Sequence, residues 1–531
     1  MPPESDRYRE AGWWTGERLV DRFESHVHAQ PDAMFLVSGT RRLTRSELWE
    51  MVCVWADQIS RTVDDRKLVV IHLPNKISWL AAFLATLRAG HVPATTPITT
   101  TVEHLQHIVD LTHPAAVISC PAHRGSTPIE DVVRAVERAA TSPAVLSTDD
   151  GRLSVVSKPG DDPTSLPLDE TTEHIMFTSS TTGPPKAVSH SDDSLATLNR
   201  QFAERFALDD TTPILMPSPL GHSVGAIHGA RLALYLGSPL ILQDEWDPVQ
   251  ALELVAEHRV AFTSAATPFL LDLLNAEWDR REPKLAPLRS FLCGGAQVPP
   301  ALVERCRDEF PNTFVTPLWG MTEGGLTTCT PDTTHRLVAS SVGFALPDLE
   351  LMVIGDDGVG RTEGVGELAM RGPGVFNGYY GQPGLYDELT TPEGYFRTGD
   401  LAEIDADGYV SITGRLKDLI IRGAVNISPV YTENVIAALR GVEGVAVIGW
   451  PDERLGERLC AVVQSTVPLE LPELLAHCEA QDLDRRYWPE RLERVDRFPR
   501  TAAGKIRKQQ LRDELLARRL TSDPSNQEEP R

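Results

Sequence analysis

The chain has 531 residues, which is too long for one comfortable hydrophobic core, so several domains or subdomains are expected. It carries 75 acidic against 51 basic residues, and the resulting formal charge of −24 disfavours a general binder of nucleic acids or anionic membranes. The seven cysteines are scattered and odd in number, which disfavours a disulfide framework or a zinc site and favours a cytoplasmic protein.

Short apolar runs alternate with helical patterns from about residue 30 to 420, which is typical of layered α/β structure. Residues 69–73 form a predicted buried strand, and a packed helix is predicted over 79–89, ended by Gly90. The first residues are too charged for a signal peptide, and the best apolar run, 79–87, is too short to span a membrane.

A helix start is unusually clear at Asp247, a capping residue followed by proline. Gln250, three residues later, stands where a capping box places glutamate or glutamine. Val249, Leu252 and Val255 are predicted to form the apolar side of this helix.

The pattern changes twice towards the C-terminus. From Leu349 onward, short strands with Gly/Asp turns predict a smaller β-rich subdomain. After Arg415, a helix over 429–439, two strands and a last helix over 506–516 predict a compact α+β unit of about a hundred residues. The polar tail from Thr521 is predicted to be frayed.

A hydroxyl-rich loop follows the apolar residues 175–177 and is the most informative segment. Its polar residues are Thr178, Ser179, Ser180, Thr181, Thr182 and, after a glycine and two prolines, Lys186. Such a loop offers backbone N–H groups, hydroxyl donors and one cation to a polyphosphate. The spacing is not that of a Walker loop, and a polar surface loop is the alternative reading.

The loop is followed, in order, by motifs that together resemble the adenylate-forming superfamily, which comprises acyl-CoA synthetases, adenylation domains of peptide synthetases and luciferases. The motifs are Pro-Leu-Trp-Gly-Met-Thr-Glu at 317–323, Gly-Tyr-Phe-Arg-Thr-Gly-Asp at 394–400, Gly-Arg-Leu-Lys-Asp-Leu-Ile at 414–420, Asn-Ile-Ser-Pro at 426–429 and Pro-Arg-Thr-Ala-Ala-Gly-Lys-Ile at 499–506. Within the family, the segments Pro-Leu-Gly-His at 219–222 and Gly-Gly-Ala-Gln-Val-Pro at 294–299 resemble those of cyclohexanecarboxylate-type and medium-chain acyl-CoA ligases.

The resemblance implies an α/β fold with a large N-terminal domain of layered subdomains and a small mobile α+β domain. The expected boundaries are 1–416 for the N-terminal domain, 417–520 for the C-terminal domain and 521–531 for a disordered tail, with a hinge at Lys417. The implied substrates and cofactors are ATP, Mg²⁺, coenzyme A and a small-molecule carboxylic acid; nucleic acids and membranes are not expected partners.

The resemblance also implies residue roles. Thr322, Glu323 and Lys505 match catalytic positions, with Glu323 at the magnesium ion and Lys505 between the acid and the α-phosphate. The remaining implied nucleotide-binding residues are the loop residues above with Gly295, Ala296, Trp319, Gly320, Met321, Asp400 and Arg415, and the implied thiol tunnel includes Gly423 and Ala424. Taken alone, Thr-Glu reads as a helix start and Lys505 as one more cation in a basic stretch.

The implied acid pocket is formed by His222, Ser223, Val224, Gly294 and Leu318. The segment that contains His222, Ser223 and Val224 has no aspartate that could bind the ammonium group of an amino acid, and the neighbouring residues are apolar. We therefore expect a mostly apolar acid: alicyclic, aromatic or medium-chain. His222 is either a wall residue of this pocket or a satisfied core histidine.

Three residues depart from the family pattern: Ser180, Ala187 and Ala424 replace glycines. The main expectation is an acyl-CoA ligase. The alternatives are an enzyme that loads a carrier protein, one that only transfers a preformed acyl-adenylate to a thiol, and a scaffold protein without chemistry. The oligomeric state is left open.

Overall fold

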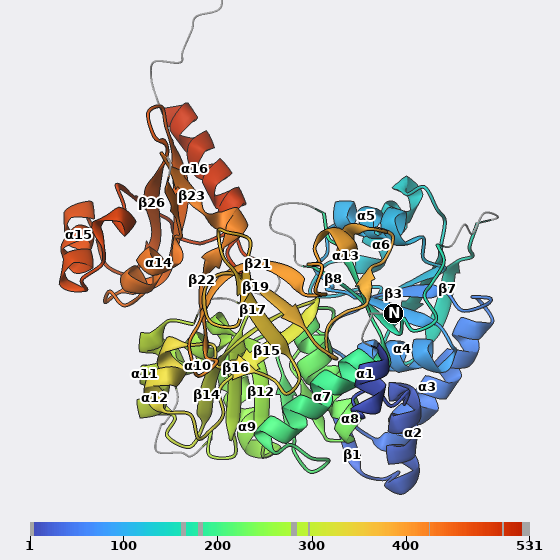
Figure 1. Cartoon of the computed structure of the whole chain (residues 1–531). Helices are drawn as coiled ribbons and strands as arrows, with labels where there is room; N and C mark the ends of the chain where they lie inside the picture. The colour runs from blue at the N-terminus through green and yellow to red at the C-terminus, as the bar shows by residue number, and fades with distance from the viewer. Residues whose placement is uncertain are drawn as a thin grey trace, which may run out of the picture.

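A computed structural model describes residues 5–160, 166–178, 184–277, 284–295, 298–423, 425–501 and 504–522. These residues build three sheets in a large N-terminal part and a fourth in a smaller C-terminal part, which projects from the rest of the molecule (Figure 1). In the described ranges, no helix has the length and apolar character needed to cross a membrane.

The first sheet has eight strands and is parallel at its centre. In spatial order they are β20 (Gly378–Tyr379), β9 (Ala187–His190), β8 (His174–Phe177), β4 (Val92–Thr96), β3 (Leu68–His72), β5 (Ala116–Ser119), β6 (Ala144–Thr148) and β7 (Leu153–Ser157). Helices α4 (Ile77–Arg88), α5 (Val102–Thr112) and α6 (Pro128–Arg138) belong to its crossovers. The strand predicted over 69–73 and the helix predicted over 79–89 are confirmed as β3 and α4.

The second sheet has nine strands. In spatial order they are β16 (Phe344–Ala345), β15 (Gly324–Thr328), β14 (Phe314–Met321), β13 (Ser290–Gly294), β12 (Phe262–Ala266), β10 (Ile214–Met216), β11 (Leu240–Leu242), β1 (Met34–Ser38) and β2 (Arg41–Thr44). Its helices are α9 (Pro248–Glu257), α10 (Thr267–Asn275), α11 (Pro300–Glu309) and α12 (His335–Ser340).

The largest hydrophobic core contains residues from both sheets and from the helices packed with them. These helices are α2 (Leu19–Ala29), α3 (Arg45–Ser60), α4, α7 (Asp192–Phe206), the π-helix η1 (Val224–Arg231) and α8 (Leu232–Leu236). Trp55, Trp79 and Phe202 are among the largest fully buried side chains in it. This core therefore joins the strands that end at the site described below.

The predicted start of α9 is confirmed in part. The Asp247 carboxylate accepts hydrogen bonds from the backbone N–H groups of Val249 and Gln250. The Gln250 side chain accepts a hydrogen bond from Gln243 at 3.0 Å rather than completing a capping box. The prediction for Val249 is wrong, because this side chain is exposed. Ala251 is buried with Leu252 and Val255 instead, so the apolar face of the helix is rotated from the predicted one.

The β-rich subdomain predicted from Leu349 onward is a five-stranded antiparallel sheet. Its strands are β18 (Gly360–Arg361), β17 (Glu350–Ile354), β19 (Gly364–Arg371), β21 (Phe396–Ile404) and β22 (Val410–Arg415), with the short helix α13 (Leu385–Glu388) beside it. The two-residue strand β20 leaves this region and pairs with β9 of the first sheet.

The C-terminal sheet has strands β24 (Val425–Ile427), β23 (Ile420–Arg422), β26 (Gly456–Ser465), β25 (Val442–Asp452) and β27 (Arg491–Arg494), with helices α14 (Val430–Ala437), α15 (Leu471–Ala480) and α16 (Lys508–Ser522). Helix α16 starts two residues later than the predicted 506 and extends into the first two residues of the predicted tail. The rest of that tail lies outside the described residues. The fold class is the predicted one.

Candidate active site

Thr322 and Glu323 lie in the tight turn between β14 and β15, not at a helix start. Both side chains are buried, and the Nε2 of His190 donates a hydrogen bond to the Thr322 carbonyl at 2.8 Å. The next residue, Gly324, has a φ of +106°, and a Cβ added there would lie 2.4 Å from the Gly374 carbonyl oxygen. Glycine is therefore required at this point, and the turn that presents Glu323 is held closely from both sides.

Glu323 is held by Tyr379, whose hydroxyl donates to Oε1 at 2.7 Å. Burial raises the pKa of Glu323, while this hydrogen bond and the charge of Lys186 oppose the rise. The Lys186 ammonium lies 4.9 Å from the centroid of the Tyr379 ring. The structure therefore groups the predicted magnesium carboxylate with the predicted phosphate-loop lysine. Sequence reasoning missed Tyr379, for which a Gly-Tyr-Tyr run was the only signal.

The predicted ribose and adenine residues lie next to each other. The Nε1 of Trp319 donates to one Asp400 oxygen at 2.8 Å, and the Nε of Arg415 lies 2.6 Å from the other. Asp400 is 3% exposed on β21 and is the strand partner of Arg415 on β22. Asp400 is therefore a strand residue fixed by two donors rather than only the turn residue that its place after Gly399 suggests.

Lys505 projects from a hairpin of the C-terminal part that packs against the N-terminal part. Its backbone N–H donates to the Thr501 hydroxyl at 3.1 Å. A Cβ added at Gly504 would lie 3.3 Å from Pro268 of α10 and 3.9 Å from Ala266 of β12. Burial and the charge of Arg415 are the main causes that lower the pKa of Lys505 to about 7.

Positive charge is therefore concentrated around Asp400. Burial and the charge of Arg415 also lower the pKa of Lys417, which lies in the short helix η2 (Leu416–Asp418) directly after β22. Three cations crowded in this way, Arg415, Lys417 and Lys505, are suited to an anionic ligand such as a nucleotide phosphate. The place of Lys417 between the two parts is compatible with a hinge, which stays a prediction.

The residues predicted to line the acid pocket converge near this cluster. The Thr322 hydroxyl lies 3.5 Å from that of Ser223, which precedes Val224 at the start of η1. A Cβ added at Gly294 would lie 2.6 Å from the Leu318 side chain, so that side chain occupies the space beside the glycine. Burial and the charge of Lys505 lower the pKa of His222 to about 4, so this imidazole is neutral beside the lysine.

The structure also describes further residues that were predicted to bind the nucleotide or to line the thiol tunnel. Thr178 accepts a hydrogen bond from the Lys186 N–H at 3.0 Å, which joins the two ends of the hydroxyl-rich loop. Gly295 follows β13 with a φ of +79°, and Gly320 and Met321 end β14. Gly423 lies in the exposed turn between β23 and β24.

Several predicted residues lie outside the described residues: Ser179, Ser180, Thr181, Thr182, Ala296 and Ala424. Of the three departures from the family pattern, only Ala187 is described. It is fully buried in the core of the first sheet opposite Phe177, and its carbonyl accepts a hydrogen bond from the Tyr380 N–H at 2.8 Å. The methyl group at this position is therefore accommodated by packing.

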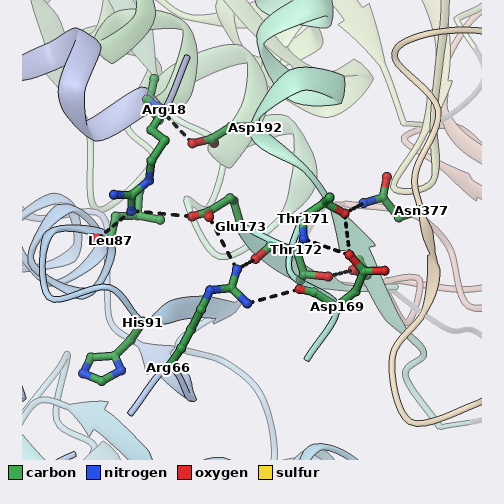
Figure 2. Close-up of polar contacts among 12 residues, drawn as sticks. Arg18, Arg66, Leu87, His91, Asp169, Thr171, Thr172, Glu173, Asp192 and Asn377 are labelled. Atoms are coloured by element: carbon green, nitrogen blue, oxygen red, sulfur yellow. Dashed lines mark hydrogen bonds and ion pairs between the residues drawn. The ribbon is translucent and has the colours of Figure 1, made fainter. Parts of the chain in front are cut away.

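A polar network anchors the segment that leads into β8 and the hydroxyl-rich loop after it (Figure 2). Arg66 donates to the carbonyl of Asp169 at 3.1 Å and lies 3.4 Å from Glu173, which Arg18 approaches from the other side at 3.8 Å. Asn377, just before β20, donates to the Thr171 hydroxyl at 3.2 Å. The network therefore joins the segments that supply Tyr379 and the loop, and no sequence motif indicated it.

The chain matches a family model described as AMP-binding enzyme over residues 23–380, and one described as AMP-binding enzyme C-terminal domain over 431–505. It is 29% identical to a medium-chain fatty-acid–CoA ligase of Escherichia coli (strain K12), over 97% of this chain and 93% of that protein. It is 30% identical to a salicylyl-CoA synthase / salicylate adenylyltransferase of Streptomyces sp., over 96% of both chains. Among solved structures, ATP-bound MatB from Rhodopseudomonas palustris is similar with a TM-score of 0.80 and 25% identity, covering 93% of this chain and 98% of that one.

Proposed function

Because the chain belongs to the AMP-binding enzyme family, as its motifs predicted, we propose that it activates a carboxylic acid with ATP and transfers the acyl group to coenzyme A. The observation that carries the proposal is the packing of the Lys505 hairpin against β12 and α10, beside Asp400 and Arg415. This packing brings a lysine of the C-terminal part to the residues that match the nucleotide site of the N-terminal part.

In the first step, a carboxylate oxygen of the acid attacks the α-phosphorus of ATP. The bond to the β-phosphate oxygen breaks, and pyrophosphate leaves with the electron pair. The Lys505 ammonium faces the charge that develops between the two reactants and lowers the barrier. In the second step, the thiol sulfur attacks the acyl carbonyl carbon, loses its proton and expels AMP, which leaves a thioester.

Glu323 fits the role of a magnesium ligand by the chemistry of its donors. Tyr379 fixes the carboxylate through Oε1, and such an oriented carboxylate suits a hard cation that prefers oxygen and takes most of its other ligands from water and phosphates. When bound, the ion would neutralise part of the phosphate charge. The residues of the chain then hold the nucleotide at both ends, with Lys186 on one side and Asp400 with Arg415 on the other.

The acid that we propose is a monocarboxylic acid with a largely hydrocarbon body. The described residues of the segment 219–225 include no acidic side chain for an ammonium group, and Leu318 fills the space beside Gly294. The names of the two relatives cover a fatty acid and an aromatic acid, which is compatible with this class. Coenzyme A is the proposed acceptor, and a carrier-protein thiol is the outcome that the following experiment separates from it.

The test is a panel of acids assayed by pyrophosphate release with ATP and Mg²⁺, after which coenzyme A is added and the thioester is sought by mass spectrometry. Lys505→Ala should lower acid-dependent pyrophosphate exchange by about 100-fold or more. Lys508→Ala is the matched control, because this lysine pairs with Glu433 at 2.7 Å within the C-terminal part. Equal loss in both variants would contradict the assigned role of Lys505.

Two other outcomes would redirect the proposal. Adenylate formation without a coenzyme A ester would indicate a carrier-protein thiol. Thioester formation from a preformed acyl-adenylate, without pyrophosphate release from ATP and any acid, would indicate an enzyme of the second half-reaction only.

A further inference from the structure

A buried polar pair lies where the π-helix η1 packs against β12. His228 of η1 and Ser264 of β12 form a hydrogen bond of 2.9 Å between Nδ1 and Oγ. Both residues are buried, and the ring of Phe202 lies 4.6 Å from the imidazole. π-Helical segments are rare and are found frequently at functional sites, so the surroundings of this pair bear on the acid pocket.

The position of the pair follows from the pleat of β12. Ala266 and Ser264 lie on the same face of the strand, because side chains two residues apart point the same way. Ala266 is the residue that the Lys505 hairpin approaches, and it is also the strand partner of Gly294. At about 3.3 Å per residue, Ser264 lies about 7 Å deeper than Ala266.

Two histidines, one just before η1 and one in it, connect the Lys505 end with Ser264. His222 stands close enough to Lys505 for the charge of the lysine to lower its pKa, and His228 stands close enough to His222 for the same effect. Lys505 therefore lies near His222 and His222 near His228, and the bond of His228 to Ser264 ties this imidazole to the deeper position on β12. The depth of Ser264 below Ala266, about 7 Å along the strand, is on the order of the length of one substituted six-membered ring.

The outer nitrogen of His228 is uncommitted. Its Nδ1 is bonded to Ser264, whereas Nε2 has no hydrogen-bond partner among the residues that the structure describes. Burial lowers the pKa of this imidazole to about 3, with a smaller effect of His222, so the ring is neutral at physiological pH. A neutral imidazole offers one donor or one acceptor and no charge, which suits a hydroxyl or carbonyl group rather than a second carboxylate.

We propose that the His228–Ser264 pair ends the acid pocket and hydrogen-bonds an uncharged hydroxyl or carbonyl oxygen on the far side of a cyclic acid. The inference rests on the proposed function and sharpens its substrate class. The preferred acid is a ring with a carboxyl group at one end and one hydroxyl or keto oxygen about a ring away, and not a plain hydrocarbon acid. If the pair served only to hold η1 against β12, the bond between His228 and Ser264 would be sufficient, and the Nε2 of His228 would have no role.

The experiment compares matched acids: benzoate with its three hydroxy isomers, and cyclohexanecarboxylate with its 4-hydroxy and 4-oxo derivatives. The kcat/KM for pyrophosphate release should be about tenfold or more higher for the best oxygenated acid, because a buried polar group left unpaired is costly. His228→Phe keeps an aromatic ring beside Phe202 and should bring this ratio close to one. Ser264→Ala should lower the ratio in part.

Ser218→Ala is the matched control, since the Ser218 hydroxyl bonds the Ser264 carbonyl at 3.4 Å and should affect both acids of a pair by the same factor. A ratio close to one in the wild type at every ring position would overturn the inference. So would a ratio that both His228→Phe and Ser264→Ala leave unchanged.

A second measurement separates this inference from the proposed function. The affinities of hydroxybenzoyl- and benzoyl-sulfamoyladenosine, which mimic the adenylate but cannot react, are compared by calorimetry. A preference for the hydroxylated compound that His228→Phe removes supports the pair even if no acid releases pyrophosphate. Equal affinities overturn the pair even if turnover is robust.

Discussion

ATP binding should be coupled to protonation of Lys505. Burial, followed by the charge of Arg415, lowers the pKa of this lysine from an ordinary value of 10.5 to about 7. At pH 8 such a group is about one-tenth protonated, and a phosphate placed beside it favours full protonation. The expected uptake is therefore about 0.9 proton for each ATP bound at pH 8 and about 0.1 at pH 6.

The sign of the same shift predicts how stability depends on pH. Between about pH 7 and 10.5 the unfolded chain holds a proton on Lys505 that the docked lysine lacks. Stability of the docked, nucleotide-free state should therefore rise with pH across this window, and protonation below about pH 7 should favour release of the hairpin.

Calorimetric titration of ATP in two buffers of different ionisation enthalpy measures the proton uptake directly. Lys505→Met should remove nearly all of it at pH 8, whereas Lys417→Met should leave most of it, since Lys417 is a neighbour of the hairpin and not part of it. An uptake close to zero in the wild type, or an equal uptake in Lys505→Met, would refute the reasoning.

Three further predictions follow from contacts of the site and core. Tyr379→Phe removes a hydrogen bond to a charged group, worth about 1.5–3 kcal/mol, and should raise the Mg²⁺ concentration for half-maximal pyrophosphate exchange; Tyr380→Phe, whose hydroxyl bonds Leu166, should not. Trp319→Phe frees one oxygen of Asp400 and should raise the KM for ATP by about tenfold; an unchanged KM would mean that the bond does not orient Asp400. Arg231→Met leaves the Asp192 carboxylate buried without its ion pair and should cost about 3–5 kcal/mol in urea unfolding, with partial recovery on adding Asp192→Asn.

Many residues of the candidate site were predictable because they belong to short contiguous motifs. Glu323, Asp400 and Lys505 each stand inside such a motif, and the order of the motifs predicted the family. The layered α/β architecture followed from the alternation of apolar runs, which needs only neighbouring residues.

The contacts between motifs were not predictable, because they depend on which strands pair. Tyr379 reaches Glu323 only because the two-residue strand β20 joins β9, and two residues show no periodicity. The bond from Trp319 to Asp400 spans 81 positions of the chain. His228 was overlooked for a related reason, since a π-helix carries no pattern in the sequence that separates it from an α-helix.

The bond between Trp319 and Asp400 also gives the protein an optical reporter. The emission of an indole ring responds to charge near its nitrogen, and here that nitrogen touches the carboxylate proposed to bind the ribose. Nucleotide binding would redistribute that charge, and the difference between the spectra of the wild type and Trp319→Phe would isolate this ring from the other nine tryptophans of the chain's 10. Occupancy of the site could then be followed in stopped flow without a labelled ligand, and separately from turnover.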